Sequence, residues 1–101
     1  MIYLVKRVFS VDPPVPGQRH IVDDLKERLA ERSGVIEATV GASLDDHTLQ
    51  RIDVELAVQV DGLSEAASIA RRAIKADLRA LGVPTLHLRL IDAAGGQISS
   101  E

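Results

Sequence analysis

The sequence contains no cysteine and no tryptophan, and its only aromatic residues are Tyr3 and Phe9. Without cysteine the chain cannot form a disulfide, a thiolate metal site, an iron–sulfur cluster or a cysteine nucleophile. The charges nearly balance, with 12 Lys and Arg against 15 Asp and Glu, whereas nucleic-acid-binding domains usually carry a basic excess. No apolar run approaches the ~18–20 residues of a membrane span. We therefore expect no membrane span and no nucleic-acid partner.

The composition is that of one small globular domain. The 101 residues are 46% hydrophobic and 27% charged, which is ordinary for a folded domain of this length. Residues 1–92 carry regular patterns and are interpreted as the domain, whereas residues 93–101 are expected to form a flexible C-terminal tail. The first residues do not resemble a secretory signal, because their charges follow a short apolar run. We expect a cytoplasmic protein.

Hydrophobic periodicity predicts four strands and two helices. Alternating or β-branched apolar residues indicate strands at 2–11, 35–42, 48–60 and 85–91. Apolar residues spaced by three and four indicate helices at 19–33 and 65–81. We expect Ser64 to cap the second helix, and Gly34 and Gly82 to end the two helices in the left-handed conformation. The three prolines in residues 12–17 predict a stiff loop outside the sheet, because proline cannot donate a backbone hydrogen bond.

The order β-α-β-β-α-β predicts an α+β fold of the ferredoxin-like class. Its sheet would have four antiparallel strands in the order 4-1-3-2, with both helices on one face. The third strand alternates most clearly, so its apolar side is expected to meet the apolar stripes of the helices. The core residues predicted in this way are Val54, Leu56, Val58, Leu25, Leu29, Ile74 and Leu78. Ile36, Leu86 and Leu90 are expected to point inward as well.

The other face of this sheet would have no helix over it. The first strand is apolar on both sides, which is typical of a strand that is covered twice. We expect Tyr3, Val5 and Phe9 to face away from the helices and to form the interface of a homo-oligomer. An RNA-binding sheet of the same topology would stack bases on aromatic residues, and the third strand offers none.

Several histidines and aspartates fall near one edge of the predicted sheet. His20 precedes Asp23 and Asp24 by three and four residues, and His47 lies in the turn between the second and third strands. Imidazole together with carboxylate suits zinc or a similar divalent ion. We therefore treat His20, Asp23, Asp24 and His47 as candidate metal ligands. Each also has an ordinary role at a helix start or in a turn.

No motif of a catalytic site is present. The chain lacks G-x-S-x-G, a Walker loop, G-x-G-x-x-G and H-E-x-x-H. The prolines at 13, 14 and 16 remove the backbone N–H groups that a phosphate-binding loop of the acylphosphatase type would need. A basic stripe on the second helix is typical of a solvated surface; its members are Arg71, Arg72, Lys75 and Arg79. We expect no catalytic residue and no cofactor, with a divalent metal as the open alternative.

Three segments carry a family resemblance. They are residues 33–37 (SGVIE), residues 54–61 (VELAVQVD) and, most clearly, residues 63–70 (LSEAASIA). Through them, residues 21–92 resemble the cytoplasmic C-terminal domain of cation diffusion facilitators. The resemblance implies a ferredoxin-like, homodimerising regulatory module. The family's metal-ligand histidine in the last segment is replaced by Ala67, and near its fourth-strand ligands only His87 and Asp92 are found. The resemblance does not carry over that metal site.

A second resemblance concerns the turn before the first helix. Asp12 followed by Pro16-Gly17 is similar to the turn of ACT-type regulatory domains, with extra residues between. Such domains pair and bind amino acids at their interface. The sequence as a whole predicts a non-catalytic, homo-oligomerising binding or regulatory module whose protein or small-molecule partner is not specified. The alternative is a small sensor that binds a divalent metal or a metabolite at the His/Asp-rich edge or at the dimer seam. A third, less favoured hypothesis is a small enzyme in which His87 or His20 acts as a base.

Overall fold

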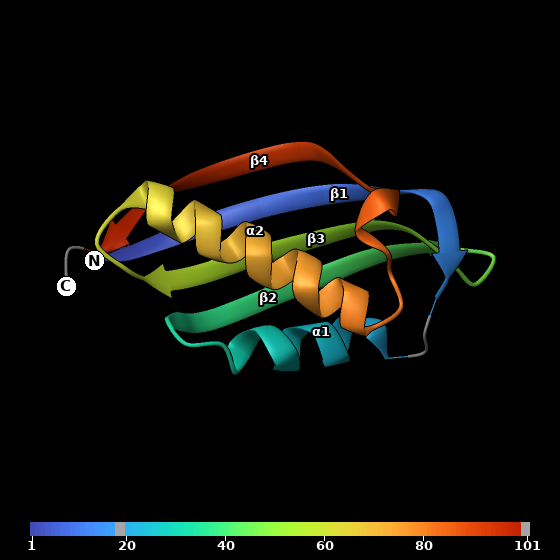
Figure 1. Cartoon of the computed structure of the whole chain (residues 1–101), viewed down its shortest axis with the longest axis horizontal. Helices are drawn as coiled ribbons and strands as arrows, with labels where there is room; N and C mark the ends of the chain where they lie inside the picture. Colours follow the sequence, from blue (N-terminus) through green and yellow to red (C-terminus); the bar gives the residue numbers. More distant parts are fainter. Residues whose placement is uncertain (18–19, 100–101) are drawn as a thin grey trace.

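The computed structural model describes residues 1–17 and 20–99, which form one layer of strands and one layer of helices (Figure 1). The elements in chain order are β1 (Ile2–Pro16), α1 (Ile21–Ala30), β2 (Val35–Asp45), β3 (Thr48–Gln59), α2 (Leu63–Ala80), the short 3₁₀ helix η1 (Thr85–His87) and β4 (Leu88–Ser99). No helix among the described residues is long and apolar enough to cross a membrane.

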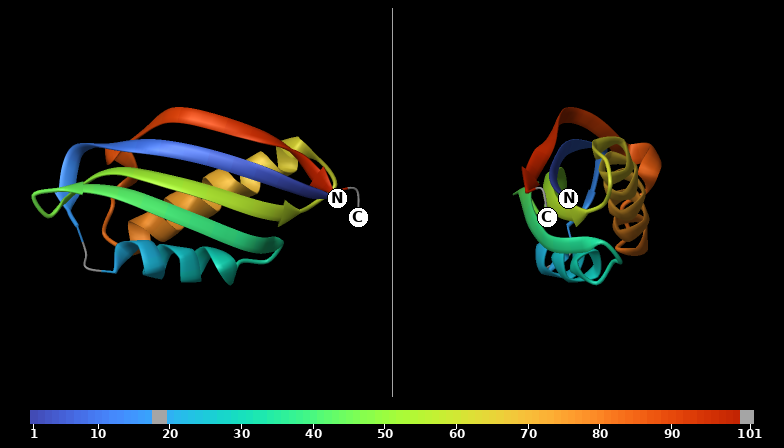
Figure 2. Two further views of the ribbon diagram at one scale, coloured as in Figure 1. Left: turned by 180° about the vertical axis from the view of Figure 1, so that it is seen from behind. Right: turned by 90° about the vertical axis from the view of Figure 1, so that its left-hand side faces the viewer.

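The four strands form one antiparallel sheet in the order β2-β3-β1-β4. This is the predicted order 4-1-3-2 read from the other side, so the predicted α+β fold is confirmed. Both helices pack on one face of the sheet, and the view from behind shows the other face without a helix (Figure 2). We call this second face the open face.

The core lies between the sheet and the helices. The inward side of β3 is fully buried, as are the apolar residues predicted to meet it from α1 and α2; these residues are Val54, Leu56, Val58, Leu25, Leu29, Ile74 and Leu78. The buried side of β3 predicted from its alternation is therefore confirmed. Gly34 and Gly82 have φ angles of 87° and 91°, so both adopt the left-handed conformation expected at the ends of the helices.

The orientation predicted for β1 is wrong. Tyr3, Val5 and Phe9 pair with Val58, Leu56 and Ile52, which face the helices. Their exposed fractions are 8%, 1% and 3%, and all three belong to the main core. The opposite side of β1, with Ile2, Leu4 and Val8, lies on the open face. Since β1 is apolar on both sides, its own sequence does not distinguish the two orientations.

The prolines do not end β1. A register irregularity lies between Ser10 and Val15, after which Val15 and Pro16 pair with Leu49 and Thr48. Pro13 and Pro14 fall within the irregularity, where the ladder to β3 requires no N–H donor from them. The predicted six-residue loop is therefore a bulged continuation of the strand.

The C-terminal segment also differs from the prediction. Residues 93–99, expected as a tail, are the second half of β4, and residues 100–101 lie outside the described part. Leu86 is in η1 and is 96% exposed, and Leu90 is half exposed. Ile36 is also half exposed, because a register shift between Val35 and Glu37 leaves it unpaired with β3.

The helices begin at positions slightly different from those predicted. The N-cap of α2 is Gly62, so Ser64 lies inside the first turn and makes no capping bond. α1 begins at Ile21, and Arg19, in the predicted first turn, lies outside the described residues.

Candidate functional site

Three segments far apart in sequence meet at one end of the molecule, on the right of Figure 1. They are the end of β1, the turn between β2 and β3, and η1. The N–H of Gly17 donates to the carbonyl of His47 at 2.7 Å. His87 Nδ1 lies 2.9 Å from the carbonyl oxygen of Pro13, which can only accept, so Nδ1 carries the proton. The predicted shared edge is therefore correct.

Most of the candidate metal ligands line one hollow at this end. Its volume is about 520 Å³, and its polar lining comes from His20, Asp23 and His47. The apolar lining of the hollow comes from Ile21, Val22 and Leu44, and Gly17 also lines it. Asp24 does not line the hollow. Among the described residues, no group of three or more His, Cys, Asp or Glu side chains is arranged to hold a metal ion.

His47 is held in an unusual backbone conformation. The β2–β3 hairpin closes with Asp46 and His47, whose φ angles are 51° and 63°. Two successive positive φ values characterise the two-residue turn that best matches strand twist, and Asn-Gly is its preferred sequence. Aspartate is common at the first of these two positions, whereas histidine at the second carries a steric cost that glycine would avoid, so the hairpin presents the imidazole to the hollow at a cost in stability.

The second set of candidates, Tyr3, Val5 and Phe9, does not form an exposed surface. All three lie beneath the helices, so they cannot contact another chain while the domain stays folded. An oligomer interface must therefore be sought elsewhere on the surface.

The exposed apolar surface that the sequence did not indicate lies on β4. Leu90, Ile91 and Ile98 are each at least half exposed. Ile91 and Ile98 fall at the two register shifts between β4 and β1. Between them, residues 93–96 are Ala-Ala-Gly-Gly. Beyond β4 the described residues place no further element (Figures 1 and 2).

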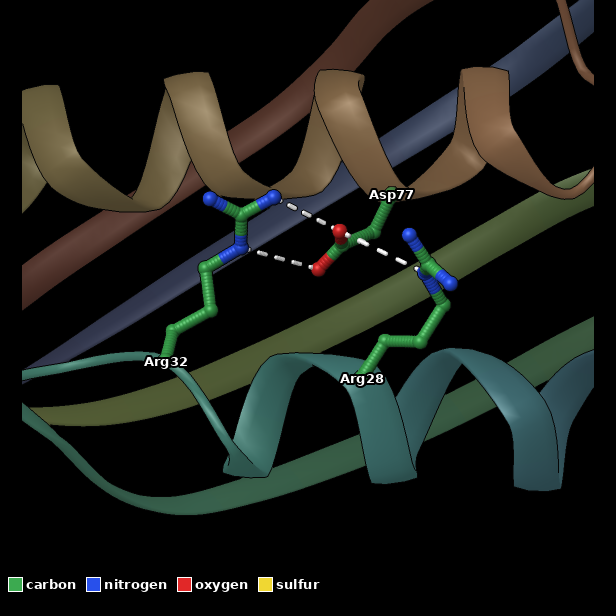
Figure 3. A network of polar contacts seen from close by, with 3 residues as sticks. All are labelled: Arg28, Arg32 and Asp77. Atoms are coloured by element: carbon green, nitrogen blue, oxygen red, sulfur yellow. Dashed lines mark hydrogen bonds and ion pairs between the residues drawn. The ribbon is translucent and has the colours of Figure 1, made fainter.

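A buried ion cluster joins the two helices. Asp77 of α2 has a side chain that is only 3% exposed. Arg32, just beyond α1, donates to it from two nitrogens, with Nε–Oδ2 at 3.1 Å and Nη2–Oδ1 at 2.6 Å. Arg28 Nε lies 3.5 Å from Oδ1 on the other side (Figure 3). Asp77 is therefore held between two guanidinium groups.

This cluster raises the pKa of Arg32. The main cause is its hydrogen bond to Asp77, with a further contribution from the charge of Asp77, while partial burial acts in the opposite direction. Stability from a raised pKa is fully present below the unfolded value and is lost only as pH rises through the folded value. Arg32 therefore stays cationic at every pH at which a protein is normally handled.

A sequence signal for Asp77 was available. Asp77 stands beside Leu78 and three residues after Ile74, so it falls on the apolar stripe of α2. A carboxylate on the buried face of an amphipathic helix requires a cationic partner, and α1 ends in basic residues. Asp77 was not predicted, because most charges of α2 are basic and are typical of a solvated helix face.

The comparisons with known proteins identify no relative. No protein-family model matches the chain, and no curated protein matches it significantly. Proposals about function therefore rest on the geometry described above.

Proposed function

We propose that this protein is a non-catalytic module that acts by self-association, with the outer edge of β4 pairing with β4 of a second copy. The observation that carries the proposal is the combination of a 12-residue edge strand with three large exposed apolar side chains on it. An edge strand exposes unpaired N–H and C=O groups, and natural proteins usually blunt such edges with lysine, proline, β-bulges or a covering segment. The register shifts of β4 lie at Ile91 and Ile98, and residues 92–97 between them pair with β1 without a break. β4 contains neither lysine nor proline.

The charges favour β4 over β2, the other edge of the sheet. β4 carries one basic and one acidic residue, Arg89 and Asp92, which cancel. β2 carries Glu37 and Asp45 and no basic residue, so two copies of it would repel. α1 also packs along β2 (Figure 1). β4 is therefore the edge that suits a second copy.

The pattern of side chains on β4 is itself suited to antiparallel self-pairing. Leu90 and Ile91 lie toward one end, Ile98 toward the other, and small residues lie between them. Two antiparallel strands centred on Ala94 would bring Leu90 and Ile91 of each copy next to Ile98 of the other. The result would be one continuous eight-stranded sheet, a mode of association in which main-chain hydrogen bonds supply much of the affinity.

Light scattering on a size-exclusion column tests this proposal. The wild type should have twice the 10.9 kDa of one chain. Ala94→Glu should be monomeric, because two glutamates would meet at the centre of the strand pair, whereas within one chain the new carboxylate stands opposite Lys6. Circular dichroism checks that the variant is folded.

Ile36→Glu is the matched control, because Ile36 is as exposed as Leu90 of β4 but lies on β2. It should leave the dimer intact. A monomeric wild type, or a dimer lost in Ile36→Glu and kept in Ala94→Glu, would refute the β4 interface.

A second candidate function is the binding of a small metabolite or a divalent ion in the hollow at the loop end. It is supported by the joint presence of His20, Asp23 and His47 around one space. His87 is engaged with Pro13 and does not line that space, so it serves as the control histidine. Calorimetric titration with zinc and with amino acids should show heat that is lost in His47→Ala and kept in His87→Ala. No heat in the wild type would leave self-association as the sole proposal.

A further inference from the structure

A second hollow, of about 620 Å³, lies between the end of α1 and the middle of α2. Its volume falls in the range typical of small-molecule sites. Arg28 and Arg32 line one side, and Arg72 lines the other. This hollow is on the helix layer and is separate from both β4 and the loop end.

The charges around this hollow do not cancel. Three arginines face Glu31 and Asp77, which leaves an excess of one positive charge among the lining side chains. A buried carboxylate is balanced by one guanidinium, and the paired contacts of Arg32 already provide it. Arg28 and Arg72 then remain beside Glu31, which leaves one positive charge without a counterpart in the lining.

The arginines retain donors that no described residue uses. A guanidinium has five N–H groups, and Arg32 directs two of its nitrogens at Asp77. Figure 3 shows its remaining nitrogen pointing away from that carboxylate. Arg72 makes a single long contact, from Nε to the carbonyl of Ser68 at 3.4 Å. Such donors suit the oxygen atoms of a carboxylate or a phosphate.

Apart from Ser33, the remaining lining of the hollow is apolar. Ile69, Ala73 and Ala76 lie at successive turns of α2 and line it beside Arg72. An apolar wall next to positively charged donors fits an organic anion better than an inorganic one. Arg32 is already oriented by the buried Asp77, so less side-chain entropy is lost when an anion binds.

From these observations we propose that the hollow between α1 and α2 binds a small organic oxyanion, either a carboxylate or a phosphate monoester, through Arg28, Arg32 and Arg72. The alternative is that the arginines only tether α1 to α2 through Asp77. The two ideas differ in what they predict for Arg72, which makes no contact with Asp77 among the described interactions.

The full chain should be titrated with butyrate and, separately, with phenyl phosphate, at constant ionic strength with chloride as the balancing salt. Arginine Nε–H signals followed by NMR should shift and saturate with one or both probes. Saturation with only one of them would tell whether the anion is a carboxylate or a phosphate ester.

Arg72→Gln should weaken that binding by about two- to fivefold, the size expected for one charged contact at an exposed site. Arg79→Gln is the matched control, because Arg79 is exposed on the same helix but does not line the hollow. Arg72 is exposed, so the variant is expected to fold, and circular dichroism checks this. A wild type that shows no saturable shift, or equal weakening in the variant and its control, would overturn the proposal.

Discussion

At the scale of single residues, burial and charge conflict most directly at Asp77. Its carboxylate is removed from water on the core side of α2, which is costly unless a partner replaces the lost hydrogen bonds. Arg32 provides that replacement with two aligned N–H groups. The exposed pair Arg51–Asp53 has a similar Nε–O distance of 3.0 Å, but both of its side chains are about half exposed.

We expect Asp77→Asn to lower the free energy of unfolding by about 1–2 kcal/mol, because it removes charged hydrogen bonds from a buried group. The partly exposed arginines regain water, which keeps the loss below that of a fully buried pair. Asp53→Asn should change stability by less than about 0.5 kcal/mol. Urea denaturation measures both, and equal losses would show that burial of Asp77 is energetically unimportant.

Leu56 provides a test of the core. Leu56→Ala should cost about 2–5 kcal/mol, the usual range for truncating a buried leucine. Glu55→Ala, one position away on the open face, should cost far less because Glu55 is only partly buried. Thermal or chemical denaturation compares the two. Similar losses would mean that the open face is as tightly covered as the core.

At the scale of elements, the β2–β3 hairpin combines a ladder interrupted by two register shifts with a turn of two positive-φ residues. We expect His47→Gly to stabilise the protein by about 1 kcal/mol, because glycine adopts positive φ without steric cost. Gly34→Ala should destabilise it by a similar amount, because Gly34 has a φ of 87°. A Cβ there would lie 3.8 Å from the carbonyl oxygen of Gln59, an ordinary contact, so the cost comes from the backbone conformation and not from a clash. Denaturation midpoints measure both changes.

A neutral or destabilising His47→Gly would show that contacts of the imidazole offset the strain of the turn. If the gain in stability coincides with loss of ligand binding, the strained turn is retained because it positions His47 at the hollow.

The elements also show where sequence patterns are informative. β3 alternates strictly, because one of its faces is buried and the other polar, so its orientation could be predicted. β1 is apolar on both sides, and only its register with β3 decides that Tyr3 and Phe9 face the helices. Ile36 lies at a register shift, which interrupts the two-residue period. Leu90 pairs in register with Phe9 but stays half exposed, because β4 is the edge strand of the sheet.

The candidate sites were partly predictable. His20, Asp23 and His47 do line one hollow, because the topology brings helix starts and hairpin turns to the same end. The predicted strand order put the fourth strand at an edge, but its continuation through residues 93–99 was not predicted, because Ala-Ala-Gly-Gly has the composition of a loop and becomes a strand only through pairing with β1.

At the scale of the whole molecule, self-association would make stability depend on protein concentration. Partner binding to the folded state stabilises it by mass action. We therefore expect the melting temperature of the wild type to rise with concentration, whereas that of Ala94→Glu should stay constant. Differential scanning calorimetry over a hundredfold range of concentration provides the measurement. A wild-type melting temperature independent of concentration would argue against a dimer that dissociates on unfolding.

The central position of β1 has a consequence for the order in which the protein can fold. Ile2 pairs with Gln59 on one side and with Ser99 on the other, so the first strand obtains both partners from distant parts of the chain. Local pairing can form only the β2–β3 hairpin early. Loop closure of this length slows the search, and folding on the order of milliseconds to seconds is expected. During synthesis β1 emerges before the other three strands, and it lacks its β4 neighbour until residues 88–99 have been added. Until then β1 is an exposed apolar segment to which a chaperone can bind.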